Sequence, residues 1–249
     1  MPVRWSSASA VLAIVLAAAP VPHGQLADAP SHQEALELFR AGQELLSAEQ
    51  FERAADAFSK SVGKDHLLSI AHYGLGQSYM NLRRYASAAK AYKDCIESMR
   101  ALHDLQENSK FQVDKQREDE VRELRTVLNQ GKGIRGPTRL QMEQRLRDLD
   151  QQRHAEGAPF RPPAEVLLAL GSAYFRNGES EGAEANWKAA LEVNPKYGEA
   201  HNNIAVIYMQ TGRFADAERE VSLAEKNGFR VNPQFKTDLK DRQKASKAQ

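Results

Sequence analysis

Cysteine is almost absent from this chain, and the marks of several protein classes are missing with it. Cys95 is the only cysteine among 249 residues, which excludes an internal disulfide framework. Basic residues number 34 and acidic residues 33, so the net charge of +1 gives no electrostatic reason to expect a nucleic-acid partner. No segment has the alternating pattern of a strand, and the sequence therefore predicts an all-α protein.

Patterns that carry chemistry are also missing. The seven histidines are scattered without metal-ligand spacing, and there is no G-x-S-x-G motif for a nucleophile. We interpret Cys95 as a small buried side chain rather than a reactive thiol. The sequence thus predicts a non-enzymatic protein without a cofactor, a metal site or catalytic residues.

Long hydrophobic runs are lacking as well. The longest, 8–19, follows Arg4 and ends at Pro20, and it is shorter than the ~20 residues that a membrane helix needs. A basic start, a short apolar core and small residues are typical of a secretory signal peptide. We expect a signal peptide and linker over 1–30, a periplasmic or secreted protein, and no membrane span after cleavage; an uncleaved anchor and a cytoplasmic chain are the alternatives. The folded part is expected to begin at Ser31, in a capping box with Glu34.

What the chain does contain is one pattern repeated four times. The copies begin near Ala35, Ser69, Ala164 and Gly198, and 34 residues separate the two members of each pair. Apolar residues at spacings of three and four predict two helices in each copy. Small residues recur at one position of each helix, where we expect the two helices to touch: Gly42, Gly76, Gly171 and Ala205 in the first, Ala54, Ala88, Ala183 and Ala217 in the second.

These residues closely resemble the tetratricopeptide repeat family, whose period is 34 residues. The resemblance implies a right-handed solenoid of helix-turn-helix repeats, with repeat pairs at 31–102 and 164–231 and a capping helix and tail at 232–249. It also implies a scaffold that binds a protein or peptide partner in a concave groove lined by the first helices.

The groove positions of the family can be placed on this sequence residue by residue. Glu165 and Glu199 fall on the groove faces of their helices. The alternative is that some groove residues only pack, or that the N-terminal segment covers them. The residues predicted to bind a peptide are Phe39, Gln43, Tyr73, Gln77, Met80, Leu168, Ser172, Phe175, Asn202, Val206 and Met209.

The segment 103–163 departs from the repeat. It is polar and charged, and 103–129 contains no proline or glycine, so the second helix of the second repeat is expected to continue into it. Thr138 is expected to cap a second helix. We predict a coiled-coil-like helical hairpin that projects from the solenoid; the alternative is that it folds back along the repeats. Its apolar stripes are Val121, Leu124 and Leu128 on one arm, and Leu140, Met142, Leu146 and Leu149 on the other.

The hairpin offers a second kind of function. Its narrow stripe is a candidate surface for self-association through 103–160, which would suit a structural or oligomerising subunit of a cell-envelope assembly. The turn 131–136 matches the G-x-G-x-x-G pattern of dinucleotide sites, but a charged helix precedes it and Pro137 follows it. We therefore interpret this segment as the basic tip of the hairpin.

Overall fold

The computed structural model describes residues 27–130, 137–151 and 159–247, and every regular element within those ranges is an α-helix. The all-α prediction is confirmed. The predicted signal peptide and the hairpin tip at 131–136 lie outside the described residues. The chain divides into two compact units: a repeat unit, described over 27–105 and 159–247, and an insert unit, described over 106–130 and 137–151.

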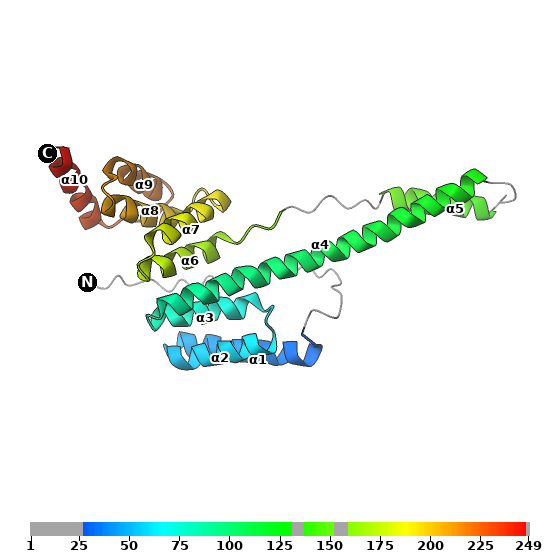
Figure 1. The fold of residues 1–249 in the computed structure, drawn as a ribbon, viewed down its shortest axis with the longest axis horizontal. Coiled ribbons are helices and arrows are strands. Elements are labelled where there is room, and N and C mark those ends of the chain that lie inside the picture. The colour runs from blue at the N-terminus through cyan, green and yellow to red at the C-terminus, as the bar shows by residue number, and fades with distance from the viewer. Residues whose placement is uncertain (1–26, 131–136, 152–158, 248–249) are drawn as a thin grey trace. The chain divides into compact units, whose positions relative to one another are not determined.

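The repeat unit consists of four helix pairs and a final helix (Figure 1). Each of the four sequence copies forms one pair, as predicted. The pairs are α1 (Ala29–Ser47) with α2 (Phe51–Lys64), α3 (Ser69–Asn81) with α4 (Tyr85–Gln130), α6 (Ala164–Arg176) with α7 (Ser180–Val193), and α8 (Gly198–Gln210) with α9 (Phe214–Lys226); α10 (Pro233–Lys247) follows.

The turn inside each pair is made at the same repeat position. Glu49, Arg83, Gly178 and Gly212 occupy it, and all four have a positive φ, between 57° and 87°. This left-handed conformation ends the first helix and is unfavourable for a residue with a Cβ. The first two repeats therefore carry local backbone strain that the last two avoid by using glycine.

The small residues of the first helices receive aromatic rings from the second. A methyl group added at Gly42, Gly76 or Gly171 would lie 2.7, 2.5 or 2.6 Å from Phe58, Tyr92 or Trp187, respectively. Each ring stands 16 residues after its glycine and is fully buried. The Phe58 ring also lies against Gly74 of the next repeat. Gly42, Gly76 and Gly171 are therefore confirmed as contacts with the second helix, and at each a ring lies against the glycine.

The fourth repeat fills the same space differently. Ala205 replaces the glycine, and the residue 16 positions later is Val221, which is buried in the same core cluster as Ala205. Compared with the other repeats, the first helix thus has an additional methyl group, and the second helix has the smaller Val221 in place of an aromatic ring. Close-packed interiors require such compensation, because added volume has to be removed elsewhere.

The second and third repeats pack directly on each other although the insert separates them in sequence. Ala88, Ala89 and Tyr92 of α4 form one core cluster with Leu170 and Ala173 of α6. The segment that returns from the insert packs on α4 as well. The Phe160 ring lies 5.7 Å from that of His103, and the Arg100 guanidinium lies 5.2 Å from its centre. The second and third repeats are therefore joined by a shared core cluster.

The predicted continuation of the second repeat's last helix is confirmed. α4 is a single helix of 46 residues that extends from Tyr85 to Gln130. In the insert unit, its C-terminal part pairs with α5 (Pro137–Gln151) through Arg139 and the Leu128 carbonyl, Arg145 and Glu120, and Arg117 and the Leu149 carbonyl. The partners follow each other in opposite order along the two helices, as in an antiparallel hairpin.

Two predicted helix starts were wrong. α1 begins at Ala29, two residues before the expected start, and its cap is Asp28, whose carboxylate accepts a hydrogen bond from the Ser31 amide. Asp28 is favoured because Pro30 fits the first turn of a helix, where its missing N–H costs nothing. In the insert, α5 begins at Pro137 rather than after Thr138 for the same reason. Leu140, assigned to the apolar stripe of α5, is 61% exposed.

Candidate interaction surface

The eleven predicted groove residues lie on α1, α3, α6 and α8, the first helices of the four repeats. Their accessibility differs widely. Gln43 is exposed; Phe39, Tyr73, Gln77, Met80, Phe175, Asn202 and Val206 are half-buried; Leu168, Ser172 and Met209 are buried. We call the eight accessible residues the first-helix face.

The three buried residues contribute to packing. Leu168 and Met209 belong to the core cluster of the third and fourth repeats, and the Ser172 hydroxyl donates a hydrogen bond of 2.9 Å to the Leu168 carbonyl. That carbonyl also accepts a hydrogen bond from the Trp187 indole at 3.2 Å. The Trp187 indole of α7 and the Ser172 hydroxyl of α6 thus share one acceptor in the buried contact between the two helices.

The aromatic residues of the first-helix face are held in place by the rings below them. The rings of Phe39 and Phe58 lie 5.7 Å apart, those of Tyr73 and Tyr92 5.4 Å, and those of Phe175 and Trp187 5.6 Å, all in tilted arrangements. Tilted pairs at these distances are favourable and restrict rotation. Each repeat of the first three therefore presents one immobilised aromatic residue on this face.

Two glutamates act electrostatically on two partly buried tyrosines of the repeat unit. Burial, then the charges of Cys95, Glu165 and Glu199, raise the pKa of Tyr73 to about 12. Burial, then the charges of Glu199, Glu165 and Tyr73, raise the pKa of Tyr197 to about 12. We call Tyr73, Glu165, Tyr197 and Glu199 the tyrosine–glutamate cluster. Both tyrosines are neutral at physiological pH and can donate hydrogen bonds.

Sequence analysis placed Glu165 and Glu199 on the groove faces but missed Tyr197, which precedes α8 rather than lying in it. Tyr197 packs against Ala164, Leu167 and Ala190 at the start of α6 and the end of α7. The signal in the sequence was that Tyr197 directly precedes Gly198. A methyl group added at Gly198 would lie 2.7 Å from Phe229 and 3.0 Å from the Ala224 carbonyl, so the chain is closely packed where α8 begins.

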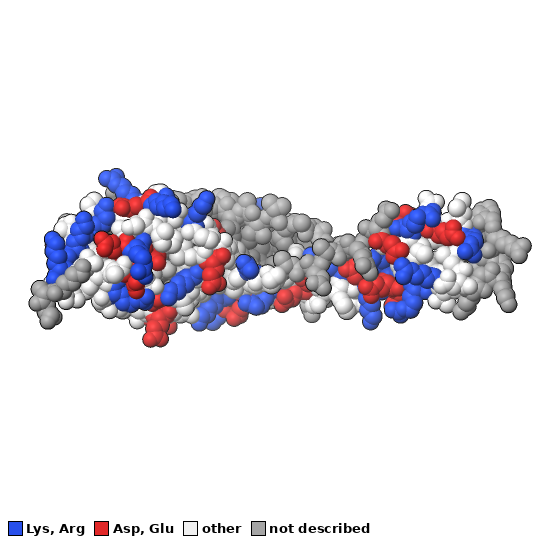
Figure 2. Space-filling model, turned by 90° about the horizontal axis from the view of Figure 1, so that it is seen from above, with Lys and Arg blue, Asp and Glu red and all other residues white. Residues whose placement is uncertain are grey.

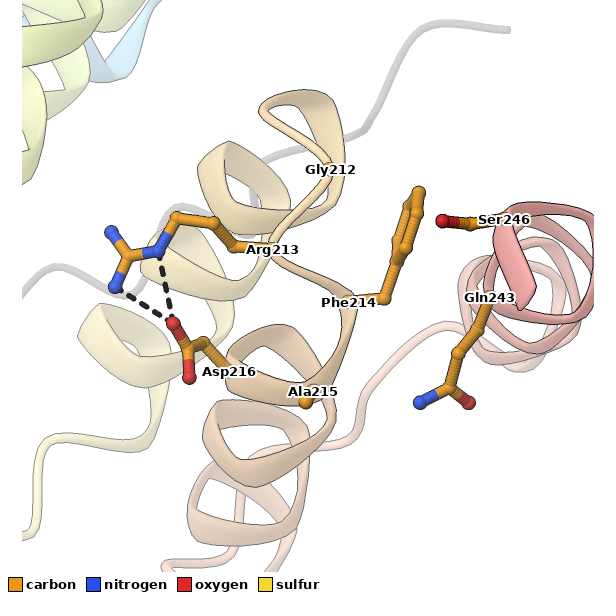
Figure 3. A pocket seen from close by; sticks show the side chains of 7 residues that line it. All are labelled: Gly212, Arg213, Phe214, Ala215, Asp216, Gln243 and Ser246. Atoms are coloured by element: carbon orange, nitrogen blue, oxygen red, sulfur yellow. Dashed lines mark hydrogen bonds and ion pairs between the residues drawn. The ribbon is translucent and has the colours of Figure 1, made fainter. Parts of the chain in front are cut away.

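A shallow pocket lies elsewhere, between the start of α9 and the end of α10 (Figure 3). It is lined by Gly212, Arg213, Phe214, Ala215, Asp216, Gln243 and Ser246. Arg213 turns away to form an ion pair of 2.8 Å with Asp216, and its guanidinium stacks 3.8 Å from the Tyr208 ring centre. With its one basic group already engaged, this pocket offers little to a charged ligand.

The residues with potential chemistry occupy structural positions. Cys95 is fully buried, and burial raises the pKa of its thiol to about 12. The buried rings of His72 and His201, at the same repeat position, contact the backbone carbonyls of His66 and Pro195. Within the described ranges, no group of three or more His, Cys, Asp or Glu side chains is placed to hold a metal ion.

Charges on the remaining surface are mixed. On the face seen in Figure 2, basic and acidic side chains are interspersed over the repeats and over the hairpin. No helix within the described ranges is both long enough and apolar enough to cross a membrane.

Helix pairs stacked at a period of 34 residues, with a ring seated on a small residue in three of four pairs, define an α-helical solenoid. Comparison with known families gives the particular one: the tetratricopeptide repeat model matches residues 39–98 and 168–228, on either side of the insert. The chain belongs to the tetratricopeptide repeat family, and its fold is that of a protein–protein interaction scaffold.

The solved structures that match this chain are distant in sequence. YrrB, a tetratricopeptide repeat protein with an unusual peptide-binding site, is 16% identical, with 84% of this chain and 93% of that chain covered and a TM-score of 0.31. A thermophilic tetratricopeptide repeat protein of Thermus thermophilus is 17% identical. The match covers 84% of this chain and 98% of that chain, with a TM-score of 0.36. PilF of Pseudomonas aeruginosa is 14% identical, covering 88% and 90%, with a TM-score of 0.36. A search of curated proteins found no match.

Proposed function

We propose that the first-helix face binds an extended or helical segment of a partner protein. The observation that carries the proposal is the set of immobilised aromatic side chains, Phe39, Tyr73 and Phe175, on three of the first helices. Gln43 and Gln77 follow Phe39 and Tyr73 by four residues on α1 and α3, and Asn202 is an accessible amide of α8. Rigid aromatic residues supply contact area at low entropic cost, and amides can bond a peptide backbone. Proteins with this fold are generally scaffolds rather than enzymes.

Site-specific photo-crosslinking tests this proposal. A photoreactive phenylalanine would replace Gln43 or Gln77 on the first-helix face, and Lys60 on the exposed side of α2 as a matched control. We expect both face positions to crosslink to one segment of a common partner, and the Lys60 position not to do so. Crosslinks that come only from Lys60 or from the hairpin would contradict the proposal.

A second candidate function rests on the insert. Three of the five large apolar side chains that are exposed within the described ranges lie on the hairpin: Phe111, Val113 and Leu140, at 63%, 50% and 61%. Exposed apolar side chains favour association with another surface. We propose self-association through the hairpin as the alternative, in a structural subunit of a cell-envelope assembly. A dimer in sedimentation that is lost when 106–158 is deleted would favour it over groove binding.

We also propose that the protein is exported, because 1–30 has the composition of a signal peptide and linker. Fractionation of cells that express the chain with and without residues 1–27 tests this. The full chain is expected in the periplasm or the medium and the shortened chain in the cytoplasm. Equal distribution of the two would contradict export.

A further inference from the structure

The first helices of the first two repeats present the same kinds of side chain at four repeat positions. Three of these positions are apolar or aromatic in both repeats, with the 34-residue period between the members of each pair: Leu36 and Ile70, Phe39 and Tyr73, and Leu46 and Met80. The fourth position holds an amide in both repeats, Gln43 and Gln77. All eight side chains are half-buried or exposed, and we call them the first-pair surface.

Contacts within the repeat unit bring the two halves of this surface together. α1 contacts α3 directly, and the buried Phe58 ring of α2 lies against Gly42 of α1 and Gly74 of α3. The Phe39 ring lies 5.7 Å from the same Phe58 ring. Tyr73 immediately precedes Gly74 in α3. The aromatic positions of the two first helices therefore adjoin across one shared ring.

The equivalent positions of the third and fourth repeats differ. Leu168, Ser172 and Met209 are buried there, and Glu165 and Glu199 occupy the positions that correspond to the aliphatic start of the first-pair surface. Only the first pair of repeats therefore leaves all of these positions both accessible and uncharged. Accessible apolar side chains that lie together favour contact with another surface.

Charged residues are kept out of the first-pair surface. α3 contains no Asp, Glu, Lys or Arg. The charged residues of α1 occupy other repeat positions, and the nearest, Arg40, is turned about 100° from Phe39 around the helix. A charged side chain placed on the surface would lose water and gain no partner of opposite charge among these eight residues, which is unfavourable. The surface therefore favours an uncharged ligand.

The two amides indicate the backbone conformation of that ligand. No hydrogen bond joins the side-chain amide of Gln43 or Gln77 to another described residue. A helical segment satisfies most of its own backbone groups, whereas an extended segment leaves N–H and C=O groups that such amides can bond. We propose that the first-pair surface binds an extended segment of the partner protein that carries large apolar side chains and no charge. This inference rests on the proposed function, since it assigns the chemistry of a segment that lies on the same face.

Selection from a phage-displayed library of short random peptides tests the inference, with protein expressed from the full chain. The variant Phe39→Ala with Tyr73→Ala serves for counterselection. We expect the peptides that are enriched only on the unchanged protein to be rich in large apolar residues and depleted of Asp, Glu, Lys and Arg. In an enriched peptide, Lys or Glu in place of the central apolar residue should weaken binding about tenfold or more.

Backbone N-methylation of the same peptide tests the role of the amides, because it removes single N–H donors. At one or more positions it should weaken binding about tenfold, and this penalty should disappear in the variant Gln43→Ala with Gln77→Ala. The matched control is Gln112→Ala with Gln116→Ala, two exposed residues of α4 in the insert unit. The penalty in this control should equal that of the unchanged protein.

Two results would overturn the inference and leave the proposed function standing. One is face-dependent binding of peptides that carry a central charge, or that bind more tightly when a side-chain bridge holds them as helices. The other is binding that depends on Phe175 but not on Phe39 and Tyr73. If no peptide depends on any of these three aromatic residues, both fail. Circular dichroism of each variant confirms that a loss of binding is not a loss of fold.

Discussion

The repeats and the hairpin are both built from antiparallel helices, but different forces hold them. In the repeats, rings rest on glycines and most contacts are apolar, with Phe58, Trp187 and Ile204 almost completely buried. Among the described residues of the insert unit, only Leu149 is buried, and the named contacts between the helices are formed by arginine side chains. A close-packed core tolerates only side chains of a particular volume at each site. Exposed ion pairs place little restriction on side-chain volume and contribute little to the free energy of unfolding. We therefore expect substitutions at close-packed sites to have larger effects than substitutions of exposed ion-pair residues.

The largest effect on unfolding of the repeats is expected from Gly171→Ala. The new methyl group would lie 2.6 Å from the Trp187 indole and 3.1 Å from the Ala183 carbonyl, and the ring is buried and hydrogen-bonded to the Leu168 carbonyl. Overpacking of this kind costs roughly 1–3 kcal/mol. Urea denaturation measures the loss. Gly63→Ala is the control, because nothing lies within 4 Å of that position and an alanine inside α2 should raise stability slightly.

In the hairpin, Leu149→Ala is expected to act locally. Leu149 is 3% exposed, and its truncation removes the best-buried apolar side chain among the described residues of the insert unit. Amide hydrogen exchange should show loss of protection in α5, while α6 to α9 keep theirs. Equal loss in the repeats would mean that the two regions unfold as one.

In the tyrosine–glutamate cluster, the substitution Glu199→Gln is expected to have a smaller effect and to increase stability. Because the pKa of Glu199 is raised by burial, the folded state holds a proton that the unfolded state releases, and stability falls as pH rises from about 4.5 through the raised pKa. Glu199→Gln should therefore stabilise the protein at pH 7, and its advantage should shrink toward pH 4. Urea midpoints across this range measure the difference. A loss of stability at pH 7 would indicate that Glu199 has a structural partner.

The smallest effect is expected from Glu120→Gln in the hairpin. The carboxylate forms an ion pair of 2.8 Å with Arg145, yet both side chains are largely in water. Solvent screens such pairs strongly, so the melting temperature should not change measurably. Thermal unfolding at low and at physiological salt checks this. A clear drop would show that the ion pairs, rather than the apolar stripe, hold the hairpin.

The sequence predicted most of the repeat architecture because each feature depends on neighbours a fixed distance away. The helix pairs and the small contact residues follow from such spacing, and the uninterrupted α4 follows from the absence of proline and glycine over 103–129. The swap of Gly and a ring for Ala205 and Val221 follows the same rule, since the partners are 16 residues apart. The prediction for the start of α1 was wrong because Asp28 and Ser31 can both cap the helix and lie within one turn of each other. Pro30 favours Asp28 as the cap.

The candidate site was harder to predict, because its parts come from distant segments. The sequence separation between Tyr73 and Glu165 is not a multiple of the 34-residue period, because the insert lies between them. Their approach depends on the docking of α4 against α6, which no local pattern specifies. Leu168 and Met209 are buried in one cluster with Trp187, a side chain of another helix, and no local pattern specifies that packing. Whether the groove residues bind a peptide stays a prediction.

The contact of Phe160 with Arg100 and His103 has a practical consequence for protein engineering. The rings of His103 and Phe160 lie 5.7 Å apart, so the entry and the exit of the insert meet at its base. A segment whose ends already touch can be exchanged as a cassette, because the closure of its ends adds little entropy cost. Hairpins of other lengths, or a fluorescent domain, could replace 106–158 and leave the four-repeat core to fold as before.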